Sequence, residues 1–162
     1  MCIRDSTLSD KGSRGEREDK SGPLIAQMLT AAGYVVEETM ILPDEAKALK
    51  AQLIRMADGR QVNLVLTTGG TGFSPRDITP EATCAVADRN APGIAEAMRY
   101  HSLSITPRGM LSRGVSVLRG KTLIVNLPGS PKAVQENLEY ILPSLEHGVR
   151  IAAGLDGECA RK

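Results

Sequence analysis

Two strand-length apolar runs, each ending at a turn rich in glycine or proline, constrain the fold of this chain more than any other feature. The first covers residues 62–67 and the second covers residues 122–127. Both are apolar at nearly every position, which is typical of parallel strands that are covered on both faces. A third β-branched run begins at residue 34 and continues toward Ile41. Longer helix-like segments lie between the runs, and this alternation predicts an α/β domain.

The segments between the strands carry the start and stop signals of helices. Each start combines a capping residue with an early proline or an apolar stripe. The starts lie at residues 21–23, Asp44, Thr79 and Ser130. Gly33 and Gly59 end the first two helices, and residues 92–111 are expected to be helical with breaks. We therefore predict one domain over residues 1–162, a doubly wound and mostly parallel sheet with helices on both faces, and a flexible tail at residues 156–162.

Charge and aromatic content exclude several classes of function. Twenty Lys and Arg balance nineteen Asp and Glu, so a net charge of +1 gives no general attraction to nucleic acid or to an anionic membrane. Three tyrosines, one phenylalanine and no tryptophan leave no platform for stacking bases. The apolar runs are too short to span a membrane, and the chain starts without an apolar signal region. We expect a cytoplasmic protein that binds neither nucleic acid nor membrane.

The cysteines and histidines do not indicate a metal centre. Three widely spaced cysteines match neither a disulfide framework nor a paired-cysteine zinc site. The two histidines are isolated from each other and from the cysteines. Because the net charge is only +1, any phosphate-bearing ligand must be held by local geometry.

Residues 67–81 carry the strongest functional signal. The segment leaves an apolar strand, passes through three glycines in four residues, and enters a helix that starts with threonine and proline. Such glycines let successive amide groups turn toward an anion, which makes a phosphate cradle without the lysine of a P-loop. A tight turn that only closes the strand is the alternative. Arg76 and Asp77, which a simple turn does not need, favour the cradle.

A second turn of this kind follows the other apolar strand, at residues 127–132. Free helix amides, the Ser130 hydroxyl and the Lys132 charge could converge there on a second anion. A plain helix cap beside a solvated lysine is the alternative. Because ligands of open α/β sheets bind beyond the carboxyl ends of the strands, we expect the two turns to form one site.

Taken together, these segments resemble the molybdopterin-binding family. That family includes the bacterial molybdopterin adenylyltransferases, pterin-binding domains of plant and animal cofactor-synthesis proteins, and the molybdenum insertases. The resemblance extends over residues 7–155. Beyond residues 67–81, it is carried by residues 9–12, 21–23, 92–99, 110–114 and 126–133.

The resemblance implies an activity and partners. It implies transfer of AMP from Mg²⁺-bound ATP to the phosphate of molybdopterin, a homotrimer, and a molybdenum insertase as a downstream partner. A non-catalytic pterin-binding or scaffold protein of the same fold is the alternative. The insertases carry additional domains on a much longer chain, so the length of 162 residues favours the adenylyltransferases over them.

The resemblance also implies roles for individual residues. Asp44 and Asp77 match acidic residues needed for catalysis and are the candidate Mg²⁺ ligands, because an ion bridging ATP phosphates usually takes one or two carboxylates. Taken singly, Asp44 is more often a simple helix cap, and Asp77 is more often a loop residue that hydrogen-bonds to its own backbone. Asp10 and Glu96 are weaker catalytic candidates. The candidate substrate-binding residues are Ser9, Asp10, Thr68, Gly69, Gly70, Thr71, Gly72, Ser112, Pro128, Gly129, Ser130 and Lys132.

Residues 1–6 depart from the family pattern, in which an apolar first strand runs into residues 7–10. Arg4 and Asp5 occupy positions where that strand should be apolar. Charged residues are poor candidates for a buried strand. We therefore expect the first strand to be shortened or replaced, and we expect removal of residues 1–6 to change stability little.

Overall fold

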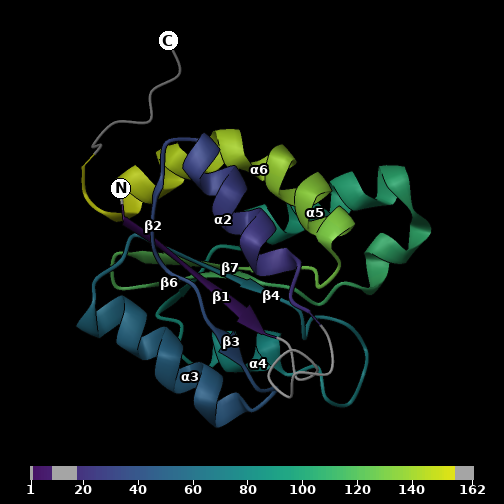
Figure 1. The fold of residues 1–162 in the computed structure, drawn as a ribbon, viewed down its shortest axis with the longest axis horizontal. Coiled ribbons are helices and arrows are strands. Elements are labelled where there is room, and N and C mark those ends of the chain that lie inside the picture. The colour runs from purple at the N-terminus through teal and green to yellow at the C-terminus, as the bar shows by residue number, and fades with distance from the viewer. Residues whose placement is uncertain (1, 9–17, 156–162) are drawn as a thin grey trace.

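A computed structural model describes residues 2–8 and 18–155 and places a single seven-stranded sheet at the centre of the molecule (Figure 1). The strand order is β2-β1-β4-β7-β6-β5, and the short β3 also pairs with β1. The strands are β1 (Cys2–Leu8), β2 (Val35–Glu38), β3 (Ile41–Leu42), β4 (Leu64–Thr68), β5 (Arg89–Asn90), β6 (Ser116–Arg119) and β7 (Thr122–Leu127).

Helices cover both faces of this sheet, as the sequence predicts. The helical elements are α2 (Ser21–Ala31), α3 (Ala46–Ile54), the π-helix η1 (Arg55–Gly59), α4 (Thr79–Cys84), α5 (Pro92–Ile105), the 3₁₀ helix η2 (Pro107–Leu111) and α6 (Pro131–Ala152). Figure 1 shows α2, α5 and α6 on one side and α3 and α4 on the other. The prediction of a doubly wound α/β domain is confirmed, and so is the broken helix over residues 92–111.

The two apolar runs are β4 and β7, and alternation along them fills two separate cores. Leu64 and Leu66 pack into the core under α2, α5 and α6, whereas Val65 packs into the core under α3 and α4. Leu123 and Ile124 divide between the two cores in the same way. Because successive side chains of a strand point to opposite faces, a strand covered on both faces must be apolar throughout.

Parallel pairing brings the carboxyl ends of four strands to one edge of the sheet. In β1 and β4, Thr7 lies opposite Thr68, and in β4 and β7, Thr68 lies opposite Leu127. In β1 and β3, Leu8 lies opposite Leu42. The strand β6 runs antiparallel to its neighbours β5 and β7, so the sheet is mixed but mostly parallel. Both predicted turns, and the loop after β3, start from this edge.

The N-terminus differs from the expectation drawn from its charges. β1 starts at Cys2 and is an interior strand between β2 and β4, with Arg4 opposite Val65 and Asp5 opposite Leu66. Backbone pairing, which charged side chains do not prevent, places the strand there. The expectation of a shortened first strand is therefore wrong, and because residues 2–6 make up most of this central strand, we now predict that their removal lowers stability.

Two helix starts also differ from the predicted caps. The cap of α3 is Glu45 rather than Asp44, and Thr79 is the first residue of α4 rather than its cap. The Thr79 hydroxyl is instead engaged with the glycine turn, as described below. Ser130 is the cap of α6, and its hydroxyl accepts a hydrogen bond from the amide of Ala133 at 3.3 Å. Across residues 18–155, no helix has the length and apolar character needed to cross a membrane.

Candidate active site at the carboxyl edge of the sheet

The turn after β4 is held in a conformation that glycine makes accessible. Gly69 and Gly70 have φ angles of 90° and 64°, in the left-handed region. The Gly69 amide donates to the carbonyl of Leu127 at 3.3 Å, which ties the turn to the end of β7. Thr79 donates twice, from its hydroxyl to the Gly69 carbonyl at 3.0 Å and from its amide to the Gly70 carbonyl at 3.1 Å. The buried Thr79 side chain is therefore an anchor for the first half of the turn.

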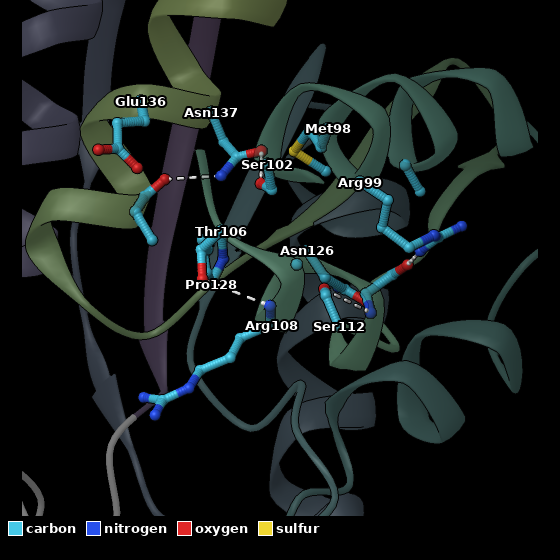
Figure 2. A pocket seen from close by; sticks show the side chains of 14 residues that line it. Met98, Arg99, Ser102, Thr106, Arg108, Ser112, Asn126, Pro128, Glu136 and Asn137 are labelled. Atoms are coloured by element: carbon cyan, nitrogen blue, oxygen red, sulfur yellow. Dashed lines mark hydrogen bonds between the residues drawn. The ribbon is translucent and has the colours of Figure 1, made fainter. Parts of the chain in front are cut away.

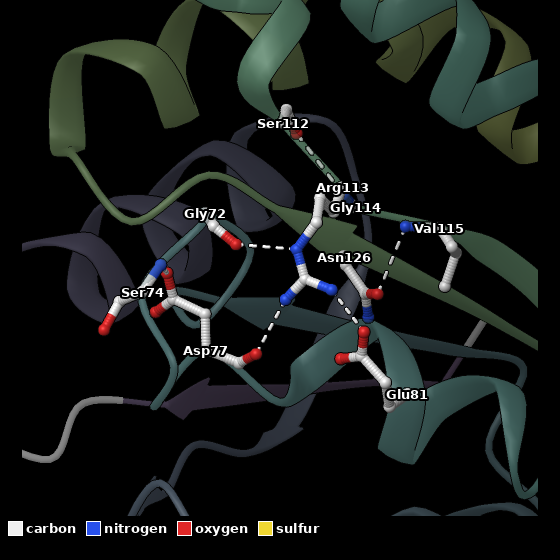
Figure 3. A network of polar contacts seen from close by, with 9 residues as sticks. All are labelled: Gly72, Ser74, Asp77, Glu81, Ser112, Arg113, Gly114, Val115 and Asn126. Carbon is white, nitrogen blue, oxygen red and sulfur yellow. Dashed lines mark hydrogen bonds and ion pairs between the residues drawn. The ribbon is translucent and has the colours of Figure 1, made fainter.

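Arg113 anchors the second half of the same turn (Figure 3). Its amide donates to the Thr71 carbonyl at 2.8 Å, and its Nε donates to the Gly72 carbonyl at 2.7 Å. Its guanidinium also donates to the Asp77 carbonyl at 2.7 Å and to the Glu81 carboxylate. The hydrogen bond from Arg113 holds the pKa of Glu81 below its ordinary value.

These bonds leave the turn with its carbonyls engaged and its amides available. The carbonyls of Gly69, Gly70, Thr71 and Gly72 all accept from the protein. In the described part of the chain, nothing accepts a hydrogen bond from the amides of Gly70, Thr71 or Gly72. Successive amide groups in such a turn form a concavity that binds anions. The geometry therefore matches a phosphate cradle better than a turn that only closes the strand.

The turn after β7 packs directly against the first turn. The Thr68 hydroxyl donates to the Pro128 carbonyl at 2.6 Å, and the Ser21 hydroxyl of α2 donates to the Gly129 carbonyl at 3.1 Å. A Cβ at Gly129 would lie 3.2 Å from the Cα of Gly69, so the close approach of the two backbones depends on glycine. The structure thus brings the two predicted turns together.

The second turn offers fewer groups to an anion than the sequence indicates. Ser130 uses its hydroxyl as the cap of α6, and Pro131 has no amide hydrogen. The Lys132 amide remains as a possible donor to an anion, because amides in the first turn of a helix have no partner within that helix. Its side chain is 85% exposed and lies 3.9 Å from Glu136. Ser130 is therefore a helix cap, and Lys132 is a solvent-exposed side chain near Glu136.

Asp77 lies in the loop between the first turn and α4, and it is half-buried. Its Oδ2 accepts from the Ser74 amide at 3.0 Å, and its own amide donates to the Ser74 carbonyl at 2.9 Å. A Cβ at Gly72 would lie 2.8 Å from that carboxylate oxygen. The Asp77 carboxylate is thus both a local loop-bonding group and a direct neighbour of the cradle.

Asp44 reaches the same edge from a different strand. It lies two residues beyond Leu42, the end of β3, and is half-buried. No group of three His, Cys, Asp or Glu side chains in the described ranges is arranged to hold a metal ion. A Mg²⁺ ion at this edge would therefore need phosphate and water oxygens beside one or two carboxylates, and this is the usual ligand set of Mg²⁺ at ATP sites.

A cavity of about 210 Å³ opens beside the second turn (Figure 2). It lies between α5, η2 and the first turns of α6, and its wall includes Ser112 and Pro128. The polar groups of its wall are held in place, since Arg99 donates to the Gly114 carbonyl at 2.7 Å. Ser102 of α5 and Asn137 of α6 are joined across it by a hydrogen bond of 3.2 Å.

Comparison with known proteins identifies the family. The sequence matches the family described as "Probable molybdopterin binding domain" over residues 6–147. The chain belongs to this molybdopterin-binding family. The resemblance seen in the motifs is therefore confirmed.

The relatives within this family are similar over most of their length. The chain is 46% identical to the molybdopterin adenylyltransferase of Escherichia coli strain K12 over 137 residues, which are 83% of this chain and 70% of that protein. It is 42% identical to the molybdopterin adenylyltransferase of Helicobacter pylori strain J99 over 152 residues, 91% of this chain and 85% of that protein. A crystal structure of the molybdopterin biosynthesis enzyme MoaB from Thermus thermophilus superimposes with a TM-score of 0.90 at 46% identity, covering 94% of this chain and 96% of that one.

Most of the candidate site residues named from the sequence lie at this edge, and four residues need separate comment. Ser9 and Asp10 fall outside the described residues. Glu96 is exposed on α5 and does not line the cavity. Arg76 is an exposed loop residue next to Asp77.

The sequence analysis missed residues that the fold brings to the candidate site. Arg113 lies inside the family motif at residues 110–114, which was the only signal that could have singled it out. Ser102, Arg108 and Asn137 carry no local signal, because α5, η2 and α6 meet around the cavity only in the folded chain.

Proposed function

We propose that this chain is a molybdopterin adenylyltransferase, which transfers AMP from ATP to the phosphate of molybdopterin and releases pyrophosphate. Relatives that are 42% and 46% identical over most of the chain are named for this activity. The observation that carries the proposal is the contact between the two turns, which makes one edge suited to two phosphate-bearing ligands side by side. Adenylyl transfer needs that arrangement, because the two phosphate groups must meet.

This reaction requires the protein to position the two substrates and to stabilise the charge on their phosphates. An oxygen of the molybdopterin phosphate attacks the α-phosphorus of ATP, a new P–O bond forms, and the bond to the leaving pyrophosphate breaks. We propose that the amides of Gly70, Thr71 and Gly72 hold phosphate oxygens as negative charge shifts between them. Lys132 of the second turn adds a positive charge. No covalent nucleophile is required, because holding the reactants in line supplies much of the acceleration.

We propose that Asp77 and Asp44 are the carboxylates that hold Mg²⁺ with the ATP phosphates. The proposal is supported by their positions at the carboxyl edge and by the closeness of Asp77 to Gly72. When bound, the ion neutralises phosphate charge. Asp77 also fixes its own loop through Ser74, which keeps its carboxylate oriented before the ligand arrives.

We propose that the cavity beside Pro128 receives a ring of one of the two substrates. Its polar groups, Ser102 and Asn137, are paired with each other and can bond to the edge of a heterocycle. Met98 and Ala95 provide apolar surface for the face of such a ring. Binding sites of small molecules commonly combine an apolar wall with a few fixed polar groups.

We propose that the protein acts in the cytoplasm as a homotrimer and passes its product to a molybdenum insertase. An apolar groove between the start of α5 and the middle of α6 supports self-association, since Ile94 and Ile141 line it and Tyr140 is 46% exposed there. Exposed apolar surface of this kind is typical of interfaces. Light scattering at micromolar concentration should give three times the chain mass, and a monomer would contradict the trimer.

The function is tested by mixing the protein with molybdopterin and Mg²⁺-ATP and measuring pyrophosphate. Release should require all three components and should stop when molybdopterin is left out. Binding of molybdopterin without release of pyrophosphate would overturn the proposal in favour of a pterin-binding scaffold of the same fold.

A further inference from the structure

Arg113 joins two parts of the site through backbone groups rather than through a ligand. Its guanidinium lies between the glycine turn and the start of α4, and it reaches the carbonyls of Gly72 and Asp77, each at 2.7 Å (Figure 3). The remaining guanidinium nitrogen donates to Glu81. All three nitrogens are thus engaged by the protein. An arginine used in this way is poorly placed to bind phosphate, and its effect must pass through the groups that it holds.

The two halves of the glycine turn have separate anchors. Thr79 and the end of β7 hold Gly69 and Gly70. Arg113 holds Thr71, Gly72 and the backbone of Asp77. Loss of the Arg113 side chain would therefore release Gly72 and Asp77 but keep the bond from the Arg113 amide to Thr71 and the bonds made by Thr79.

We propose that Arg113 is a positioning residue that sets the spacing between the Gly72 amide and the Asp77 carboxylate. This inference rests on the proposed adenylyl transfer. The spacing is tight, since a Cβ at Gly72 would lie only 2.8 Å from the Asp77 carboxylate oxygen. A planar guanidinium can reach both carbonyls and Glu81 at once, whereas the single ammonium of lysine cannot span the same three acceptors. The position therefore specifies arginine for its shape as well as its charge.

Arg113→Gln tests this role, with Arg119→Gln as a matched control. Arg119 makes the same kind of contacts, donating to the Val86 carbonyl at 2.7 Å and to both carboxylate oxygens of Asp58. Its side chain has similar exposure, 23% against 33% for Arg113, but it lies at the opposite edge of the sheet. Arg113→Gln should lower kcat on the order of 100-fold, the typical effect of a misplacement near 1 Å, with little change in KM for molybdopterin. Arg119→Gln should leave both parameters close to those of the native protein.

A double-mutant cycle separates positioning from general destabilisation. If Arg113 acts through Asp77, then Arg113→Gln should have little further effect on kcat once Asp77 is already asparagine. Arg119→Gln provides the additive reference in the same background. Full multiplication of the two losses, Arg113→Gln with Asp77→Asn, would overturn the proposal.

A measurement without substrate tests the positioning role of Arg113 separately from the activity. In Arg113→Gln and in the milder Arg113→Lys, exchange of the hydrogen-bonded amides of Ser74 and Asp77 should accelerate, and exchange in residues 122–127 should stay unchanged. Unchanged exchange of the Ser74 and Asp77 amides would overturn the positioning role even if turnover fell. Absence of pyrophosphate release by the native protein would instead overturn the proposed function and leave the exchange result to decide the positioning role.

Discussion

Gly70→Ala is the substitution whose cost the structure defines most sharply. Gly70 has a φ of 64°, and an added Cβ would lie well inside the 3.0 Å that real Cβ atoms keep from the Thr79 hydroxyl oxygen. That hydroxyl cannot rotate away without cost, because it is buried and donates to the Gly69 carbonyl. Left-handed backbone costs a non-glycine residue about 1–2 kcal/mol. Loss of a buried hydrogen bond adds about 1–3 kcal/mol, so we expect a total of about 2–5 kcal/mol.

Gly120→Ala isolates the backbone part of this cost. Gly120 has a similar φ of 53°, but nothing lies within 4 Å of an added Cβ. Its amide donates to Asp88 at 2.6 Å, and a side chain leaves that bond in place. This variant should therefore lose only about 1–2 kcal/mol.

Urea unfolding followed by circular dichroism measures both free energies of unfolding. In a Thr79→Ala background, which removes the obstructing hydroxyl, Gly70→Ala should cost no more than Gly120→Ala does. Pyrophosphate release should fall strongly in Gly70→Ala and remain in Gly120→Ala, because Gly70 belongs to the cradle and Gly120 does not. Equal losses of stability in Gly70→Ala and Gly120→Ala would refute the steric reasoning.

Three further predictions follow from the same structure. Asp77→Asn should lower turnover by about 100- to 1,000-fold, because it removes the charge. Molybdopterin affinity and thermal stability should be retained, since the amide side chain still has an oxygen for the loop hydrogen bond. A parallel loss of binding and stability would show that the role of Asp77 is structural. Glu81 has its pKa lowered by the hydrogen bond from Arg113, so its contribution to stability is present above the ordinary value of 4.5 and is lost as pH falls through the lowered pKa. The difference in melting temperature between the native protein and Glu81→Gln should accordingly shrink in acid, and a pH-independent difference would contradict this assignment. Deleting residues 1–6 should abolish cooperative thermal unfolding, because it removes most of an interior strand; an unchanged melting curve would count against the pairing of β1.

Much of the site was predictable because its signals are local. A run of apolar residues predicts a strand covered on both faces, and glycines directly after it predict a turn with left-handed backbone. Gly69 and Gly70 adopt that conformation, and Ser130 caps α6 through its own hydroxyl. Each of these features depends on residues within a few positions of one another. Sequence reasoning works best at that range.

Other features depend on residues far apart in the chain. Thr79 was predicted as a helix cap, but its hydroxyl is taken by Gly69, ten positions away. Arg113 bonds to Gly72 across 41 positions. No local pattern distinguishes such a partner from a solvated side chain, since the competition is decided by which groups the fold brings within reach.

The sequence by itself determined the α/β class, the glycine turn after β4, the capped turn after β7 and membership of the molybdopterin-binding family, since these depend on hydrophobic period, turn chemistry and motif. Only the tertiary structure decided that Arg4 and Asp5 belong to an interior strand. It alone decided that Gly129 packs against Gly69, because that contact depends on the parallel pairing of β4 with β7. The chemistry of a side chain is specified by one residue, whereas strand pairing depends on many backbone hydrogen bonds that form only when distant segments meet.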